Sequence, residues 1–154
     1  MSPRRAIALL SLLGLFVALY LTLYHMGLVG ALSCSVGSCE TVQSSKYAMF
    51  MGMPVAALGL GAYVVLLAMA MAGLQLRWEE SMTVSRALAA VSGVGFVFSV
   101  WLTYLELFVI HAICQWCVIS AILMTLIFVA SLIDNRRETS DVSSQKSDVI
   151  ADGA

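Results

Sequence analysis

Charged residues are scarce in this chain. Aspartate, glutamate, lysine and arginine make up only 11% of its 154 residues, while 61% are hydrophobic. Ordinary soluble domains have about 25% charged and about 45–50% apolar residues. The mean hydropathy of +0.96 therefore excludes an ordinary soluble protein and indicates a membrane protein. Basic residues are not in excess, with eight Lys and Arg against nine Asp and Glu, so we expect no nucleic-acid partner.

Residue types that bind metals or act as nucleophiles are also few. The chain has two histidines and four cysteines. The cysteines are Cys34, Cys39, Cys114 and Cys117. We therefore expect the chemistry of the protein to lie in these four residues, in or at a membrane.

Four apolar stretches are long enough to cross a bilayer, for which about 20 residues suffice. Between residues 87 and 133 the only charged residue is Glu106. One helix over this segment would be about 70 Å long, so the chain must turn back, and the polar residues Glu106, His111 and Gln115 mark the turn. The expected spans are residues 6–29, 55–76, 87–108 and 113–133. The sequence thus predicts an all-α integral membrane four-helix bundle over residues 1–133.

Basic residues beside the spans predict the orientation, because cytoplasmic loops are enriched in Lys and Arg. Those expected on one side are Arg4, Arg5, Arg77, Arg86, Arg136 and Arg137. Lys46 alone is expected on the other side. Both termini are therefore predicted to be cytoplasmic. Residues 134–154 are polar and rich in Ser and Asp, and they predict a disordered cytoplasmic tail.

This topology places both cysteine pairs on the outer face, where disulfides persist. Cys34 and Cys39 fall in the loop between the first two spans, and Gly and Ser between them permit a mobile loop. Cys114 and Cys117 begin the fourth span, with a spacing that puts both sulfurs on one helix face. A helix N-terminus favours the thiolate, which is the attacking species in disulfide exchange. The two pairs are therefore predicted to exchange electrons.

Interpretations without catalysis remain open at this point. Two cysteine pairs can form a four-thiolate zinc site, although the spacing of Cys34 and Cys39 is loose for one, or they can form structural disulfides. The protein would then be a non-enzymatic membrane assembly factor.

A carboxylate at mid-bilayer costs about 2.5–3.5 kcal/mol and much less at the interface. Glu106 can therefore either orient the hairpin between the last two spans or accept protons during a reaction.

Several short motifs point to one known family. They are Cys34 and Cys39, Ser45, Tyr47-Ala48, Gly52-Met-Pro-Val-Ala56, Gly59, Tyr63, Tyr104-Leu-Glu106, Cys114-Gln-Trp-Cys117 and Ser120. Together they resemble the vitamin K epoxide reductase family, and in particular its bacterial members that form disulfide bonds. The resemblance extends from the first span to about Ile133.

This resemblance implies a protein of the inner (cytoplasmic) membrane that binds a quinone, ubiquinone or menaquinone, near its outer end. Electrons would reach the quinone from a periplasmic thioredoxin-fold dithiol protein. By this analogy Cys34 exchanges with the partner, Cys39 attacks Cys114, and Cys117 faces the quinone. Ser45 is expected beside the quinone. Many bacterial members carry a fused thioredoxin-like domain after the last helix, where this chain has its polar tail, so the partner is expected to be a separate protein.

Two aromatic residues near the cysteines, Phe50 and Trp116, are also expected to line the quinone pocket, although an interfacial aromatic belt would enrich the same residue types. Eukaryotic members of the family place a Tyr four residues after the last active cysteine, where this chain has Ala121. They also carry a quinone-binding Asn in the second helix, where Val55 falls. These departures do not favour epoxide reduction.

Overall fold

The computed structural model describes residues 3–35, 37–74 and 82–152. Arg77, which was used to predict the orientation, lies outside the described residues. Residues 75–76, the predicted end of the second span, also lie outside them.

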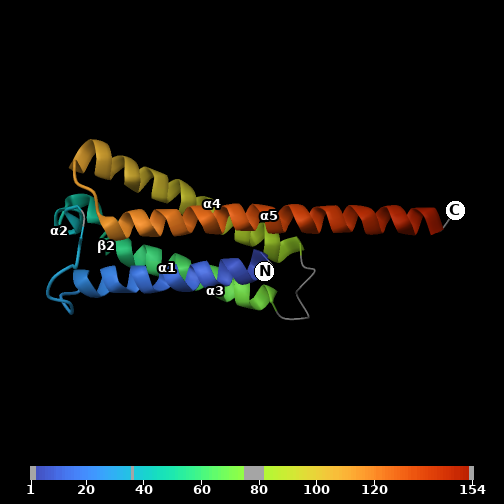
Figure 1. Cartoon of the computed structure of the whole chain (residues 1–154), viewed down its shortest axis with the longest axis horizontal. Helices are drawn as coiled ribbons and strands as arrows, with labels where there is room; N and C mark the ends of the chain where they lie inside the picture. The colour runs from blue at the N-terminus through green and yellow to red at the C-terminus, as the bar shows by residue number, and fades with distance from the viewer. Residues whose placement is uncertain (1–2, 36, 75–81, 153–154) are drawn as a thin grey trace.

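Four long helices form the bundle. They are α1 (Pro3–His25), α3 (Val55–Gly73), α4 (Met82–Leu105) and α5 (Gln115–Asp152). Within the described residues, four helices are long and apolar enough to cross a membrane. Helix α1 packs against α3 and α5, and α4 packs mainly against α5, which it crosses at an angle (Figure 1). These helices confirm the prediction of an all-α, multi-pass membrane bundle.

Short elements gather at one end of the bundle, at the left of Figure 1. They are α2 (Cys39–Gln43), the 3-10 turn η1 (Lys46–Ala48), β1 (Met49–Phe50), β2 (Met53–Pro54) and the π-helical turn η2 (Glu106–Ile110). Strands β1 and β2 pair antiparallel, with Met49 opposite Pro54. Met51 and Gly52 form the turn with φ of 51° and 84°, as a tight hairpin requires. All four cysteines lie at this end.

The end of α1 is set by a glycine. The predicted span runs to residue 29, but α1 ends at His25. Gly27 adopts a φ of 75°, and the amide of Leu28 donates a 3.0 Å hydrogen bond to the carbonyl of Leu23. This six-residue closure is the usual way in which a glycine terminates a helix.

The interior of the bundle is packed with aliphatic side chains around one tyrosine. Ile7, Leu66, Leu88 and Ile127 are fully buried, and Tyr63 is 1% exposed. The Tyr63 ring lies directly over Gly14 of α1, where a Cβ would overlap it. Large apolar side chains also cover the outside of the helices, among them Leu13, Phe16, Val94 and Val97. An apolar exterior around a packed interior is what a helix bundle surrounded by lipid requires.

Helix α5 continues well beyond the other helices (Figure 1). At 1.5 Å per residue its 38 residues are about 57 Å long, nearly twice the thickness of a hydrocarbon core. Residues 134–152, expected to be a disordered tail, are helical in the structure. Two causes account for the difference: no Gly or Pro interrupts α5, and Asp134 and Glu138 are held by a partner on α1.

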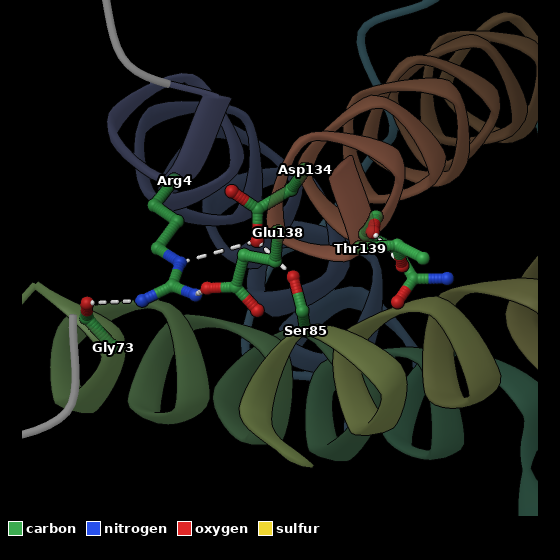
Figure 2. Close-up of polar contacts among 7 residues, drawn as sticks. Arg4, Gly73, Ser85, Asp134, Glu138 and Thr139 are labelled. Atoms are coloured by element: carbon green, nitrogen blue, oxygen red, sulfur yellow. Dashed lines mark hydrogen bonds and ion pairs between the residues drawn. The ribbon is translucent and has the colours of Figure 1, made fainter. Parts of the chain in front are cut away.

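That partner is Arg4, whose contacts Figure 2 shows; it lies in the first turn of α1, at the end of the bundle away from the cysteines. Its Nε lies 3.1 Å from Oδ2 of Asp134, and it also forms an ion pair with Glu138. Its Nη1 donates a 2.8 Å hydrogen bond to the carbonyl of Gly73 at the end of α3. The Ser85 hydroxyl of α4 donates to Asp134. One cluster therefore joins all four long helices.

Candidate active site

The loop between α1 and α2 contains a disulfide between Cys34 and Cys39. Cys39 is the first residue of α2 and is buried, with 2% of its surface exposed. Cys34 is only partly buried. Of the two sulfurs, that of Cys34 is therefore the one that a protein outside the bundle reaches first.

The second pair lies at the start of α5, and both of its cysteines are thiols. Cys114 precedes the helix and is fully buried, whereas Cys117 lies in the first turn and is partly buried. A hydrogen bond with the Cys117 side chain lowers the pKa of the Cys114 thiol below its ordinary value, although burial acts in the opposite direction. Cys114 is thus the member of the pair that is more easily released as a thiolate.

Backbone pairing holds the loop against the start of α5. Gly37 and Cys114 form an antiparallel bridge, and the Ser38 amide donates a 2.9 Å hydrogen bond to the Ile113 carbonyl. Gly37 has a φ of 92°, and a Cβ there would overlap the Ile113 carbonyl oxygen. Only glycine fits this close approach.

Side chains strengthen the same junction. The Trp116 indole donates a 3.0 Å hydrogen bond to the Ser33 carbonyl, and the Ser35 amide donates a 3.1 Å hydrogen bond to the Gln115 side chain. The four cysteines consequently belong to one cluster, packed with Leu21, Leu32 and Val42. The fold therefore brings two pairs that are about 80 residues apart in sequence into one cluster.

A cavity of about 510 Å³ lies beside Cys117. Its wall comes mainly from α3, α4 and the start of α5, and it is largely apolar, with side chains such as Val55, Leu58, Val94, Phe98 and Leu102. Nine of the lining residues have polar side chains: Gln43, Ser45, Tyr47, Tyr63, Ser99, Thr103, Glu106, Cys117 and Ser120. A concave, mostly apolar site of this size with a few polar groups is typical of sites for small organic molecules.

Hydrogen bonds to neighbouring residues hold polar side chains of the cavity wall in place. The Tyr63 hydroxyl donates a 2.9 Å hydrogen bond to the Ser120 carbonyl. The Ser45 hydroxyl donates a 2.7 Å hydrogen bond to the Val42 carbonyl, which leaves its oxygen able to accept one. The Gln43 side-chain nitrogen lies 3.7 Å from the Cys117 sulfur.

Glu106 is the one acidic residue of this wall among the described residues, and it is 6% exposed. Its Oε2 accepts a 3.2 Å hydrogen bond from the Cys114 amide. Its carboxyl group also hydrogen bonds with the Cys117 side chain. It therefore contacts both residues of the thiol pair.

Of the residues expected to bind a quinone, Cys117 and Ser45 line the cavity, whereas Phe50 and Trp116 do not. Phe50, in the hairpin, packs edge-on against Phe98 and Trp101, with centroids 5.9 and 6.2 Å apart. Trp116 packs against Tyr20 instead, at 5.1 Å. The cause for Trp116 is helical geometry, because a residue directly before Cys117 points about 100° away from it.

Sequence reasoning missed Gln43 and gave no role to the Tyr63–Ser120 pair. Tyr63 and Ser120 both belong to the family motifs, which mark them as candidates. The motifs do not reveal that the two residues form a hydrogen bond with each other. Nothing in the sequence singles out Gln43. It reaches Cys117 because α2 folds back over the start of α5.

The cysteines do not present four thiolates to a metal ion, because two of them form a disulfide. In the part of the chain that the structure describes, no three or more His, Cys, Asp or Glu side chains group as a metal site. The arrangement instead offers a disulfide and a pair of thiols in one cluster, and disulfide exchange needs both.

The sequence model of the Vitamin K epoxide reductase family matches residues 5–132 of the chain. The matched segment includes all four cysteines and every described residue that lines the cavity, the buried Glu106 among them. It ends within α5, before the polar part of that helix.

Proposed function

Because the chain belongs to the vitamin K epoxide reductase family and is a membrane thiol–disulfide oxidoreductase, we propose that it reduces a membrane quinone with electrons from a protein dithiol. The dithiol belongs to a separate thioredoxin-fold protein on the outer side of the inner membrane. Its reoxidation drives disulfide formation in other proteins. The observation that carries the proposal is the cluster of four cysteines, which includes the partly exposed Cys34 and also Cys117 in the cavity wall.

The relay begins at the loop. A partner thiolate attacks Cys34, and two exchanges leave the partner oxidised and Cys34 and Cys39 reduced. The Cys39 thiolate then attacks Cys114 of an oxidised Cys114–Cys117 pair, which forms a Cys39–Cys114 disulfide and releases Cys117. Attack of Cys34 on Cys39 restores the loop disulfide and releases Cys114. The lowered pKa of Cys114 favours this last step, because a thiol of low pKa leaves faster.

The structure has the sulfur arrangement that this relay leaves behind, with the loop pair oxidised and the inner pair reduced. The cavity fits a quinone head group in volume and in its apolar wall. The Gln43 amide has a second N–H that would donate to a quinone oxygen, and the hydroxyl oxygens of Ser45 and Tyr63, whose protons are donated to backbone carbonyls, would accept from the hydroquinone. A bound quinone would accept two electrons and two protons, and Cys114 and Cys117 would return to a disulfide.

The charge distribution supports the proposed orientation. Helices α1 and α4 begin, and α3 ends, at the end of the bundle away from the cysteines. Arg5 and Arg86 therefore lie at that end, and Lys46 lies at the cysteine end. With basic residues inside, the cysteines face outward and both termini face the cytoplasm.

Quinone reduction by the purified protein tests the proposal. We expect the protein in detergent to consume ubiquinone or menaquinone analogues, followed by absorbance, when a small dithiol is supplied, at rates well above the protein-free background. The same sample is assayed for bound metal. Absence of turnover from a folded protein, or one tightly bound zinc per chain, would instead support the assembly-factor interpretation.

Replacing Gly37 by alanine should uncouple the loop from the inner pair. The new Cβ would overlap the Ile113 carbonyl, and alanine is strained at a φ of 92°. We expect turnover driven by a protein dithiol to fall roughly tenfold, which corresponds to about 1.4 kcal/mol. Oxidation of prereduced Cys114 and Cys117 by quinone in a single turnover should be unchanged.

Gly30→Ala is the matched control, because no atom lies within 4 Å of a Cβ at this loop position. It should retain wild-type turnover. Equal losses in the two variants would show that the loop tolerates neither change and that the bridge to Cys114 has no special role.

A further inference from the structure

Glu106 is a buried acid with no cation beside it among the described residues. Both ion pairs found in the described residues involve Arg4, at the opposite end of the bundle. Among the described residues that line the cavity there is no Arg, Lys or His. The titratable groups that face Glu106 are the thiols of Cys114 and Cys117, with Tyr47 and Tyr63 elsewhere in the cavity wall. Burying a carboxylate in such surroundings is costly, so its presence needs a reason.

The backbone is deformed where Glu106 occurs. Residues Glu106–Ile110 form a π-helical turn at the end of α4, and His111 follows with a φ of 54°. The Ala112 amide closes this turn with a 3.2 Å hydrogen bond to the Glu106 carbonyl. π-Helical turns are rare and are frequently found at functional sites. Here the turn accompanies the placement of Glu106 in the cavity wall, while its neighbour Leu107 is exposed on the outside.

A structural role explains only part of this arrangement. The hydrogen bond from the Cys114 amide needs an oxygen acceptor, and the neutral side chain of glutamine has one. The contact with Cys117 is different, because a carboxylate can take the proton of a thiol and an amide cannot. What glutamate adds to the site is therefore the capacity to hold a proton next to the sulfur that faces the cavity.

We propose that Glu106 is a catalytic residue that takes the proton of the Cys117 thiol and delivers it into the cavity. The proposal rests on the proposed quinone reduction. In each turnover the S–H bond of Cys117 breaks and its proton moves to the Glu106 carboxylate. Two electrons leave the thiol pair as the Cys114–Cys117 bond forms, and they reduce the quinone to hydroquinone. Glu106 returns its proton to one quinone oxygen, and the proton of Cys114 reaches the other through solvent.

The first experiment compares wild type with Glu106→Gln, which keeps an acceptor for the Cys114 amide. The protein is prereduced and mixed with a ubiquinone analogue, and the single-turnover rate is measured against pH. We expect the rate to fall about 100-fold at neutral pH, the lower end of what general acid–base catalysis contributes. The wild-type rate should be level near neutral pH and decline toward low pH as Glu106 becomes protonated, whereas the variant's rate should change with pH across the whole range, because the Cys117 thiol must then lose its proton to solvent.

Two further variants separate proton transfer from packing. Glu106→Asp should recover part of the rate and keep the decline at low pH. Glu40→Gln, which removes an exposed acid at the same end of the bundle, should behave as wild type. A Glu106→Gln protein with the wild-type rate and pH profile would overturn the proposal and leave quinone reduction standing.

An infrared measurement tests Glu106 without a quinone. The thiol pair is oxidised by a soluble oxidant, and the difference spectrum between dithiol and disulfide forms is recorded. We expect a change in a carboxylic acid C=O band in wild type and in Glu40→Gln, and its loss in Glu106→Gln. If wild type fails to reduce quinone, the proposed function fails, while this spectrum still decides whether Glu106 exchanges a proton with the thiols. A spectrum without the band would overturn the proposal for Glu106.

Discussion

Cys117→Ser is expected to abolish quinone reduction. Cys117 is the only thiol among the described residues that line the cavity, so no other cysteine can deliver electrons there. The neighbouring Cys114 is fully buried behind it. Loss of an essential nucleophile typically costs several orders of magnitude in rate, so turnover should fall to the background of the detergent assay. The measurement is loss of quinone absorbance with a small dithiol as donor.

Cys34→Ser provides the matched comparison at the other end of the relay. A small dithiol can reduce the inner pair without the loop, so its turnover should be largely retained. Turnover driven by a protein dithiol should be strongly impaired, because Cys34 is the accessible sulfur of the loop disulfide. A Cys34→Ser protein that loses equal fractions of its turnover with the protein donor and with the small dithiol would contradict the proposed order of exchange.

The spans and the cysteine chemistry could be predicted from the sequence because both depend on local patterns. Hydropathy over about 20 residues identifies a membrane helix whatever it packs against. The polar residues from Glu106 to Gln115 indicated the turn between α4 and α5, and the structure has η2 and the break at Cys114 there. The spacing of Cys114 and Cys117 likewise fixes them on one face of a helix.

The rest of the site depends on contacts between distant segments. The bridge from Gly37 to Cys114 and the contact of Gln43 with Cys117 join residues more than 70 positions apart, and no local pattern encodes them. The inward placement of Glu106 depends on a π-helical turn that periodicity does not reveal. For Trp116, closeness in sequence to the cysteines suggested a place in the cavity wall, whereas in the structure its indole bonds to the Ser33 carbonyl and is not part of the described lining.

Arg4 is another residue whose contacts with distant segments no local pattern reveals. Its replacement is expected to have the largest effect on stability. Its place beside the first span predicted only the side of the membrane on which it lies, whereas in the structure it is 5% exposed and pairs with Asp134, 130 residues away. Arg4→Leu would leave two carboxylates, Asp134 and Glu138, without their cation in a buried cluster (Figure 2). Breaking a buried ion pair by removing one partner costs about 3–5 kcal/mol. We expect the free energy of unfolding in detergent, measured by denaturant titration, to fall by about that amount.

Arg5→Leu is the control, because Arg5 is exposed on the same turn of α1 and its loss changes the net charge identically. Its free energy of unfolding should change by less than about 0.5 kcal/mol, as for most surface substitutions. A third variant with Leu at positions 4, 134 and 138 removes the whole cluster. Replacing a buried ionic cluster entirely with apolar side chains is often neutral, so this variant should recover most of the loss. Equal destabilisation by the Arg4 and Arg5 variants would mean that net charge at this end, rather than the ion pairs joining α1 to α5, stabilises the bundle.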